Sequence, residues 1–234
     1  MHVLVVQNFD GTGLGQMKTA LDEARARIEI VHAHHGDTLP QGPDGYDALV
    51  VLGGGQNALA DDVHPYLPRL CDLMREFADS DRSVLGICLG SQLLARAYGA
   101  ENIIGGATEF SWQEVDLTED GVADPIFTGL PARFPTFEWH DDTFVQPRGA
   151  VRLAGNLAVH NQAFRIRRAA YGMQFHFEAD RALVEHWNDT FATWLGERQP
   201  GWPERHPVEA ARFGAQADEA GLAIARNWVA TIRV

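Results

Sequence analysis

The sequence predicts an α/β fold, in which a doubly wound, mostly parallel sheet lies between two layers of helices. Two observations lead to this prediction. Through the first half of the 234 residues, short apolar runs typical of buried strands alternate with segments whose apolar residues recur every three or four positions. Strands that alternate in this way with amphipathic helices form parallel sheets with helices on both faces.

The first half of the chain contains four expected strands and three expected helices. The strands are expected at residues 3–6, 28–31, 47–52 and 84–87. The helices are expected at about residues 14–28, 67–77 and 89–98. Gly53-Gly54-Gly55 ends the third strand, and Cys88 follows the fourth. Because ligands of parallel sheets bind beyond the carboxyl ends of the strands, we expect these two turns to share a crevice.

From about residue 105 the pattern becomes rich in short strands. These are expected at residues 113–117, 133–139, 151–154 and 170–175, with some antiparallel pairing. Helices return at about residues 180–196 and 214–232, and Pro200, Pro203 and Pro207 are expected to separate them. We expect one domain over residues 1–234, with a helical extension from about 200 to 234.

Composition and charge exclude several classes of partner. The formal net charge of −13 argues against nucleic acids and anionic membranes, since both attract basic surfaces. No apolar stretch is long enough for a membrane helix, and the first residues lack the basic leader of a signal peptide. Two cysteines, Cys71 and Cys88, are too few for a disulfide framework. We therefore expect a cytoplasmic protein without nucleic-acid or membrane partners.

The segment Gly86-Ile87-Cys88-Leu89-Gly90 joins an apolar strand to a helical pattern. Its glycines allow a tight strand-to-helix turn, which lifts Cys88 above the sheet at a helix N-terminus. The unpaired N–H groups and the dipole of the helix favour a thiolate at that place. The pattern is the cysteine counterpart of the nucleophile elbow, so Cys88 is the candidate nucleophile of a hydrolase.

A thiol nucleophile needs a base, and His176 is the best candidate. If the expected strand continues to residue 178, His176 and Glu178 point to the same face of the sheet. The carboxylate of Glu178 could then orient the imidazole as the third member of a triad. A lone histidine is more often a packed or surface residue, but here it occurs together with the glycine-flanked cysteine.

The triple glycine admits two interpretations. It could be a plain turn, or its backbone N–H groups could form an oxyanion hole together with that of Leu89. It is not a phosphate-binding loop, because it lacks both the trailing Gly-Lys-Ser/Thr and the glycine spacing of dinucleotide sites.

A group of histidines follows the second strand. No cysteine or carboxylate at ligand spacing accompanies His32, His34 and His35, so a solvated loop is favoured over a metal site. Cys71 lies on the apolar face of a helix and is expected to pack in the core. We expect no metal and no cofactor.

Taken together, these motifs resemble the class I, triad-type glutamine amidotransferase family. Residues 86–94 are similar to the nucleophile motif of that family, and Gln174-Phe175-His176-Phe177-Glu178 is similar to its His-Pro-Glu motif. The resemblance extends from the first strand to about residue 195, and it includes residues 139–143 and 161–164. It is strongest with free-standing members, which lack a fused synthetase domain, and it implies a flavodoxin-like, three-layer fold for a single amidotransferase domain.

The resemblance also implies a mechanism. In it, Cys88 attacks the side-chain amide of glutamine or of another γ-glutamyl compound, His176 protonates the leaving ammonia or amine and then activates water, and Glu178 holds the ring. The backbone N–H groups of Gly54 and Leu89 stabilise the oxyanion. Contacts to the substrate are implied for Gln92, Asn161, Ala163 and Phe164.

Four positions depart from the family pattern. Gly55 and Phe177 replace prolines, Asn57 stands near the usual serine, and Ala163 replaces a glycine. These changes bear on the identity of the substrate more than on the type of reaction.

Several functions remain open at this point. The chain could be a glutaminase subunit that passes ammonia to a separate synthetase, or a stand-alone hydrolase of γ-glutamyl peptides or amides. A non-catalytic relative is disfavoured by the intact Cys88, His176 and Glu178. A cysteine α/β-hydrolase is disfavoured because in that fold the acid precedes the histidine.

Overall fold

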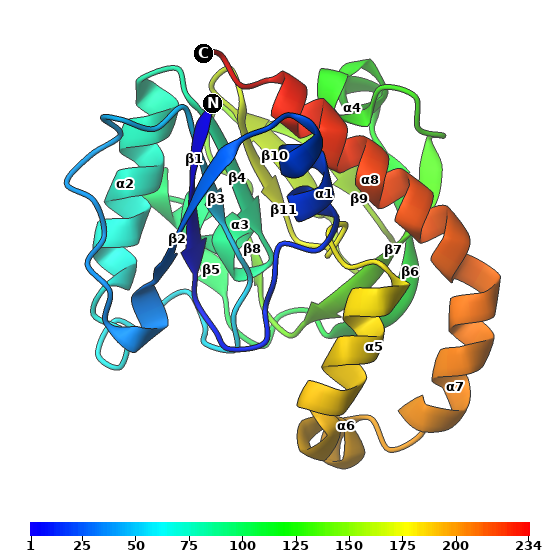
Figure 1. The fold of residues 1–234 in the computed structure, drawn as a ribbon. Helices are drawn as coiled ribbons and strands as arrows, with labels where there is room; N and C mark the ends of the chain where they lie inside the picture. Colours follow the sequence, from blue (N-terminus) through cyan, green and yellow to red (C-terminus); the bar gives the residue numbers. More distant parts are fainter.

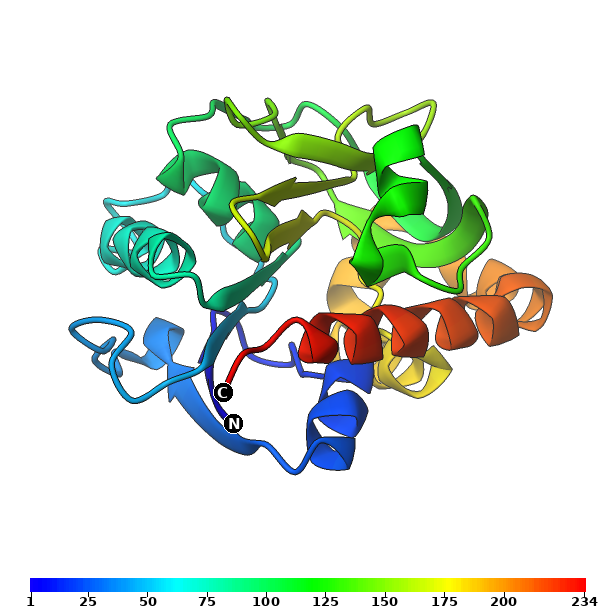
Figure 2. The same ribbon diagram turned by 90° about the horizontal axis from the view of Figure 1, so that it is seen from above.

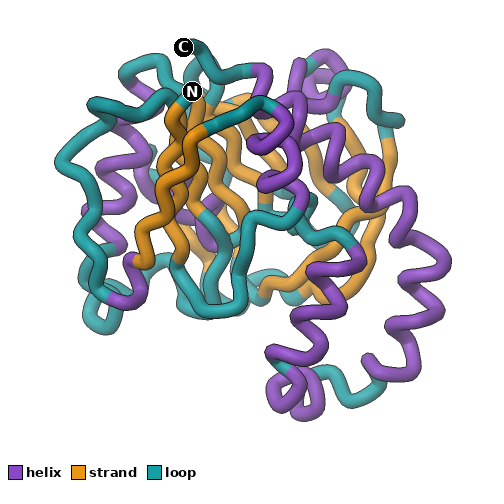
Figure 3. Tube along the Cα trace, in the orientation of Figure 1, coloured by secondary structure: helices purple, strands orange, loops and turns teal.

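The computed structural model describes residues 1–234, and a nine-stranded sheet forms its centre (Figures 1 and 3). Five neighbouring strands are parallel, in the order β2 (Arg27–His32), β1 (His2–Gln7), β3 (Ala48–Val51), β4 (Ser83–Ile87) and β11 (Ala170–Met173). Antiparallel pairing then adds β10 (Ala163–Ile166), β9 (Val151–Gly155), β6 (Glu109–Leu117) and β7 (Arg133–His140). The strands β5 (Asn102–Ile103) and β8 (Thr143–Phe144) form a separate ribbon. This arrangement confirms the predicted α/β fold.

Helices cover both faces of the sheet, as the view along a perpendicular direction shows (Figure 2). The helices α1 (Gln16–Glu23) and α8 (Ala215–Ala230) lie on one face, and α2 (Leu67–Asp79) and α3 (Leu89–Ala97) lie on the other. Side chains of β1 alternate between the two cores: Val3 and Val5 pack with α1 and α8, whereas Leu4 and Val6 pack with α2 and α3. Because both faces are buried, the strand is a continuous apolar run.

The remaining helices surround the antiparallel half of the sheet. They are α4 (Glu119–Ala123), α5 (Arg181–Thr190), α6 (Ala192–Arg198), α7 (Trp202–Glu209) and the short turn at Pro125–Phe127. A further short turn, at Ala33–His35, directly follows β2 at the parallel edge of the sheet. Aromatic side chains join α5 and α7 to β6 and β7, with Trp112 and Phe137 from the sheet against Trp187 and Trp202 from the helices. None of the helices combines the length and the apolar composition needed to cross a bilayer.

The structure differs from the sequence prediction at three elements. The first helix ends at Glu23 because Arg25 adopts a left-handed conformation (φ 53°), and Ile28 belongs to β2 instead. Strand β10 was not predicted. Of the three prolines, Pro200 does lie between two helices, α6 and α7, but the other two do not. Pro203 lies in the first turn of α7, where its missing N–H has no helical partner to lose, and Pro207 lies inside α7, which continues through a π-helical turn (Ala210–Gly214) into α8.

The carboxyl ends of the parallel strands meet at one edge of the sheet. Asn8 follows β1, Gly53 comes shortly after β3, and Cys88 directly follows β4. The segment that carries His176 leaves β11 at the same edge. This is the edge at which ligands of such sheets bind.

Candidate active site

Cys88 lies in a strained turn between β4 and α3. Its backbone has φ 50° and ψ −110°, and it is the N-cap residue of α3. A Cβ atom on Gly86 would collide with the carbonyl oxygen of Gly90, and one on Gly90 would collide with that of Val51. Only glycine therefore allows this approach of helix and strands, which confirms the geometric basis of the predicted elbow.

The imidazole of His176 is fixed by a carboxylate. Nδ1 of His176 lies 2.7 Å from Oε1 of Glu178, and both side chains are buried. The ring also packs edge-on against Trp187, with 5.2 Å between the ring centres. The condition for the same-face argument, a strand that continues to residue 178, is not met, because β11 ends at Met173 and His176 makes only an isolated bridge to Phe137.

The electrostatics of this pair favour an ionised histidine. Burial by itself lowers the pKa of His176, but the Glu178 carboxylate and the Cys88 thiol together raise that pKa well above its ordinary value. An imidazolium beside a thiol stabilises the thiolate, which is the nucleophilic form of cysteine.

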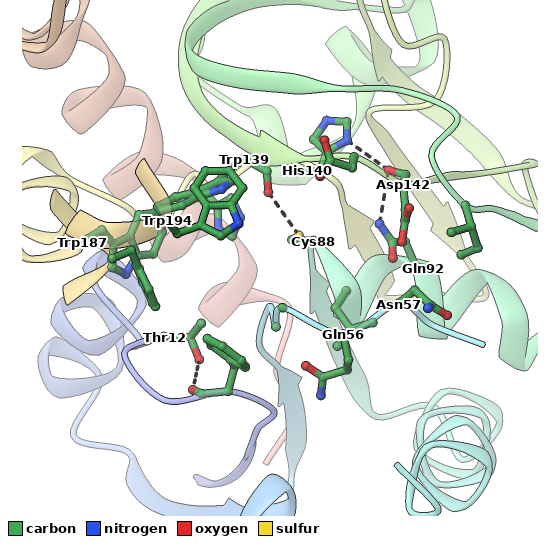
Figure 4. Close-up of a pocket in the computed structure, with 18 residues that line it drawn as sticks. Thr12, Gln56, Asn57, Cys88, Gln92, Trp139, His140, Asp142, Trp187 and Trp194 are labelled. Atoms are coloured by element: carbon green, nitrogen blue, oxygen red, sulfur yellow. Dashed lines mark hydrogen bonds between the residues drawn. The ribbon is translucent and has the colours of Figure 1, made fainter. Parts of the chain in front are cut away.

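Cys88 and His176 face each other across Gly53. A Cβ atom on Gly53 would lie 3.2 Å from Cε1 of His176 and 3.5 Å from Cβ of Cys88. The thiol itself points to the carbonyl oxygen of Trp139, at an Sγ–O distance of 3.7 Å (Figure 4). The two residues, 88 positions apart in the sequence, therefore lie close together in the fold.

A cavity of about 570 Å³ opens above Cys88. Cys88, His176, Gly54, Leu89 and Gln92 line one part of it. An aromatic wall forms another part and consists of Phe9, Trp139, Trp187, Phe191 and Trp194 (Figure 4). The cavity is thus polar around the thiol and apolar toward α5 and α6.

The two residues expected to form an oxyanion hole lie side by side. A Cβ atom on Gly54 would lie 2.9 Å from Cδ2 of Leu89. Leu89 is the first residue of α3, so its N–H has no partner within the helix. Both backbones therefore border the cavity next to Cys88.

The residues expected to contact substrate fall into two groups. Gln92 lines the cavity, and its side-chain amide donates to Oε1 of Gln174 at 3.1 Å and to the carbonyl of Asp142 at 3.3 Å. Asn161 instead donates to the carbonyl of Phe144 at 3.0 Å, outside the cavity.

Two more of the expected substrate contacts lie in the sheet. Ala163 and Phe164 are buried in β10, where the ring of Phe164 packs against Phe144 and Gly172. The structure does not bring either residue to the cavity. Residues 139–142 border it in their place, directly after β7. The signal for this segment was present in the sequence, since residues 139–143 belong to the resemblance.

A buried ionic cluster behind the cavity was missed by sequence reasoning. Nε2 of His140 lies 3.2 Å from a carboxylate oxygen of Glu109 and 3.2 Å from one of Glu138. Glu109 also accepts from Asn156 and Gln162, whereas Glu138 has no further donor. Burial raises the pKa of Glu138 to about 7, although His140 opposes this shift.

The pKa of His140 is raised as well, which for an imidazole favours the charged form. Burial lowers its pKa, but the hydrogen bonds to Glu109 and Glu138 outweigh burial and raise the pKa to about 10. The protonated form of His140 is therefore favoured where this residue lines the cavity, with the carboxyl groups of Glu109 and Glu138 beside it. One half of the cluster has a local sign in the sequence, since Glu138 and His140 are two positions apart and point to the same face of β7. Glu109 joins them only through the pairing of β6 with β7, in which it stands opposite His140.

The protein thus has a mostly parallel α/β sheet, and a cysteine elbow and a hydrogen-bonded His–Glu pair border one cavity. This fold and this arrangement place it in the class of α/β proteins with a triad-like thiol site. Comparisons with known proteins agree. Residues 6–185 match the family described as glutamine amidotransferase class-I. The chain therefore belongs to the class I glutamine amidotransferase family.

Individual relatives point to the same family. The chain is 29% identical over 205 residues to the glutamine amidotransferase-like protein YfeJ of Salmonella typhimurium, and the match covers 85% of each protein. It is 28% identical over 155 residues to one subunit of the glutamine-hydrolyzing GMP synthase of Thermoplasma acidophilum, covering 65% of this chain and 72% of that one. A solved glutamine amidotransferase from Thermotoga maritima has a TM-score of 0.83 at 27% identity, covering 98% of this chain and 96% of that one.

Proposed function

We propose that the protein hydrolyses the γ-glutamyl amide of glutamine through a thioester on Cys88 and releases ammonia. The observation that carries this proposal is the 2.7 Å hydrogen bond between His176 and Glu178 in the cavity that also contains Cys88. A histidine already oriented by a carboxylate, beside a thiol at a helix N-terminus, suits covalent catalysis.

The first half-reaction forms the thioester. The thiolate of Cys88 attacks the γ-carbonyl carbon, and the oxyanion that develops is stabilised by the N–H groups of Gly54 and Leu89. His176, as the imidazolium, gives its proton to the leaving nitrogen while the C–N bond breaks. Ammonia leaves, and His176 becomes neutral.

The second half-reaction restores the enzyme. Neutral His176 accepts a proton from water, whose oxygen attacks the thioester carbon. The C–S bond then breaks, which releases glutamate and leaves Cys88 as a thiolate beside the His176 imidazolium. Glu178 keeps the ring in one orientation through both steps.

The proposal includes a partner for the ammonia. One relative belongs to a glutamine-hydrolyzing GMP synthase built from more than one chain, so we propose that a synthetase on a separate chain consumes the ammonia released here. The reaction needs a free Cys88 thiol, which fits a reducing compartment such as the cytoplasm.

A second candidate is a stand-alone hydrolase of γ-glutamyl peptides or amides, and the aromatic wall favours it. Trp139, Trp187 and Trp194 line a cavity whose volume lies within the usual range for ligand pockets. Aromatic surface next to the nucleophile would bind an apolar leaving group better than it would bind ammonia.

A turnover panel with purified protein tests both candidates. Ammonia release from glutamine and amine release from γ-glutamyl peptides are measured with the wild type and with Cys88→Ser. Glutamine turnover that requires an added synthetase supports the role of a glutaminase partner, and peptide turnover without any partner supports the stand-alone hydrolase. If neither substrate turns over and a glutamine-like electrophile fails to label Cys88, the protein is a non-catalytic relative and the proposal is wrong.

A further inference from the structure

We propose that Asp10, His34 and His35 form a surface site for a divalent transition-metal cation of the Zn²⁺ type, next to the loop that borders the active-site cavity. The proposal does not depend on the hydrolase activity proposed above. It also revises the interpretation of the histidine group as a solvated loop, which was based on the lack of a cysteine or carboxylate at ligand spacing in the sequence.

The topology of the sheet supplies the missing carboxylate. Strands β1 and β2 are parallel neighbours, and Gln7 stands opposite His32 at their carboxyl ends. The loop after β1, which carries Asp10, therefore meets the turn after β2, which carries His34 and His35. One ligand atom from each of these three residues lies within 4.8 Å of the others.

The distances suit a common ligand. Nε2 of His34 lies 3.0 Å from Oδ1 of Asp10, and Nε2 of His35 lies 3.2 Å from the same oxygen. Ligands bound to tetrahedral zinc at about 2.0–2.1 Å are roughly 3.3 Å apart, so only a small adjustment is needed. Imidazole nitrogens select zinc-like cations over calcium or magnesium, which prefer oxygen ligands.

The second nitrogen of His34 is already oriented as in metal sites. Its Nδ1 lies 3.0 Å from the carbonyl oxygen of Gln7, and a carbonyl can only accept, so Nδ1 carries the proton. In the neutral ring, Nε2 then directs a lone pair at the Asp10 carboxylate. Two electron-rich groups at this distance repel unless a proton or a cation lies between them. A backbone carbonyl on the distal nitrogen is also the usual partner of a metal-bound histidine.

A cation bound by Asp10, His34 and His35 would act on the cavity through the short loop that follows β1. Phe9 and Thr12 flank Asp10 and both line the cavity. Between them, the carbonyl oxygen of Gly11 accepts a hydrogen bond from Nε1 of Trp187 at 3.0 Å. A cation held by Asp10 would therefore restrict the loop that contacts the aromatic wall.

Calorimetric titration with Zn²⁺ tests the site. The protein carries no histidine tag and has Cys88→Ser in its background, because Cys88 and His176 could otherwise bind the probe. We expect one Zn²⁺ per chain, and we expect His34→Ala and Asp10→Asn each to weaken binding by at least about tenfold. His160→Ala, at an exposed histidine beyond β9 whose Nδ1 lies 3.1 Å from Arg152, should bind like the parent.

Two controls show whether Zn²⁺ binds at Asp10, His34 and His35 or elsewhere on the protein. Asp10→Asn preserves the size of an exposed side chain, and equal thermal midpoints show that loss of binding is not loss of folding. Glu109→Gln probes the other group with metal-ligand geometry, which is the buried Glu109–Glu138–His140 cluster. The proposal is overturned if the parent does not bind Zn²⁺, if Asp10→Asn and His34→Ala bind as tightly as the parent, or if only Glu109→Gln loses binding.

Discussion

Nδ1 of His176 and Oε1 of Glu178 lie 2.7 Å apart although β11 ends before either residue. Separate backbone anchors hold the two residues. The N–H of His176 donates to the carbonyl of Phe137 at 2.8 Å, and the carbonyl of Glu178 accepts from the N–H of Gln16 at 2.9 Å. The pair is thus fixed between β7 and α1, which keeps the imidazole in one orientation beside Cys88.

Replacing the nucleophile should abolish turnover without unfolding the protein. Cys88→Ala removes the only atom that can form the thioester, so we expect γ-glutamyl hydrolysis to fall by at least about 1000-fold, as for loss of a nucleophile in other triads. Ammonia release and the thermal midpoint are measured together. The matched control is Cys71→Ala, at a buried thiol in α2 whose pKa burial raises to about 12, and it should keep full activity. A folded Cys88→Ala protein with normal turnover would refute the assignment.

Glu178→Gln tests the orienting carboxylate. The amide keeps the shape of the side chain but no longer carries the charge that favours the imidazolium, so we expect kcat to fall about 100-fold or more with little change in KM. Steady-state kinetics with glutamine measure both constants. Glu197→Gln, at an exposed position in α6, provides the control. If both variants behave like the wild type, another group orients His176.

The oxyanion loop can be tested by adding one carbon atom. A Cβ atom at Gly54 would lie 2.6 Å from Oε1 of Gln56 and 2.9 Å from Cδ2 of Leu89, so Gly54→Ala forces these two side chains to shift next to Cys88. We expect kcat to fall by about 10- to 100-fold, because donors to an oxyanion act in the transition state. Gly13→Ala is the matched control, since nothing lies within 4 Å of its Cβ position. Equal kcat values for the two variants would place the oxyanion hole elsewhere.

The residues in these tests could be predicted from the sequence because each of their motifs lies within a short segment of the chain. The elbow at Cys88 and the His176–Glu178 spacing lie within short segments, where glycine geometry and side-chain reach limit the possibilities. The cluster of Glu109 with His140 depends on strand register, and the meeting of Asp10 with His34 depends on which strands are neighbours. Neither contact can be predicted from a periodic pattern in the sequence.

The substrate contacts show a different limit of sequence reasoning. A short similarity at Asn161–Phe164 suggested a substrate segment, but β10 pairs with β11 and β9 in the middle of the sheet and buries the side chains of Ala163 and Phe164. The antiparallel strands do not follow a repeated βαβ order, so the sequence did not indicate which of their ends reaches the site. The loop after β7 reaches the site because β7 lies at the edge of the sheet and its His140 end turns toward Cys88.

The aromatic wall distinguishes the two proposed substrates. The indole of Trp194 lines the cavity and packs 5.2 Å from that of Trp139. If the wall binds the leaving group, Trp194→Ala should lower kcat/KM for a γ-glutamyl arylamide by about tenfold, in line with the loss of buried aromatic area. Turnover of glutamine serves as the internal control and should change little. An equal loss on both substrates would mean that Trp194 only supports the fold of the site.

The buried carboxyl of Glu138 should make stability depend on pH. Burial raises its folded-state pKa to about 7, above the ordinary value of 4.5, so the native protein binds more protons than the unfolded chain between these values. The contribution of Glu138 is therefore fully present below about pH 4.5 and is lost as the pH rises through 7. Glu138→Gln is neutral at every pH and removes this loss. Urea unfolding at pH 5, 6 and 7 should show the variant gaining stability relative to the wild type by up to roughly 1.4 kcal/mol per pH unit. Glu114→Gln, an exposed position on β6, should show no such trend, and parallel curves for Glu138→Gln and the wild type would contradict the raised pKa.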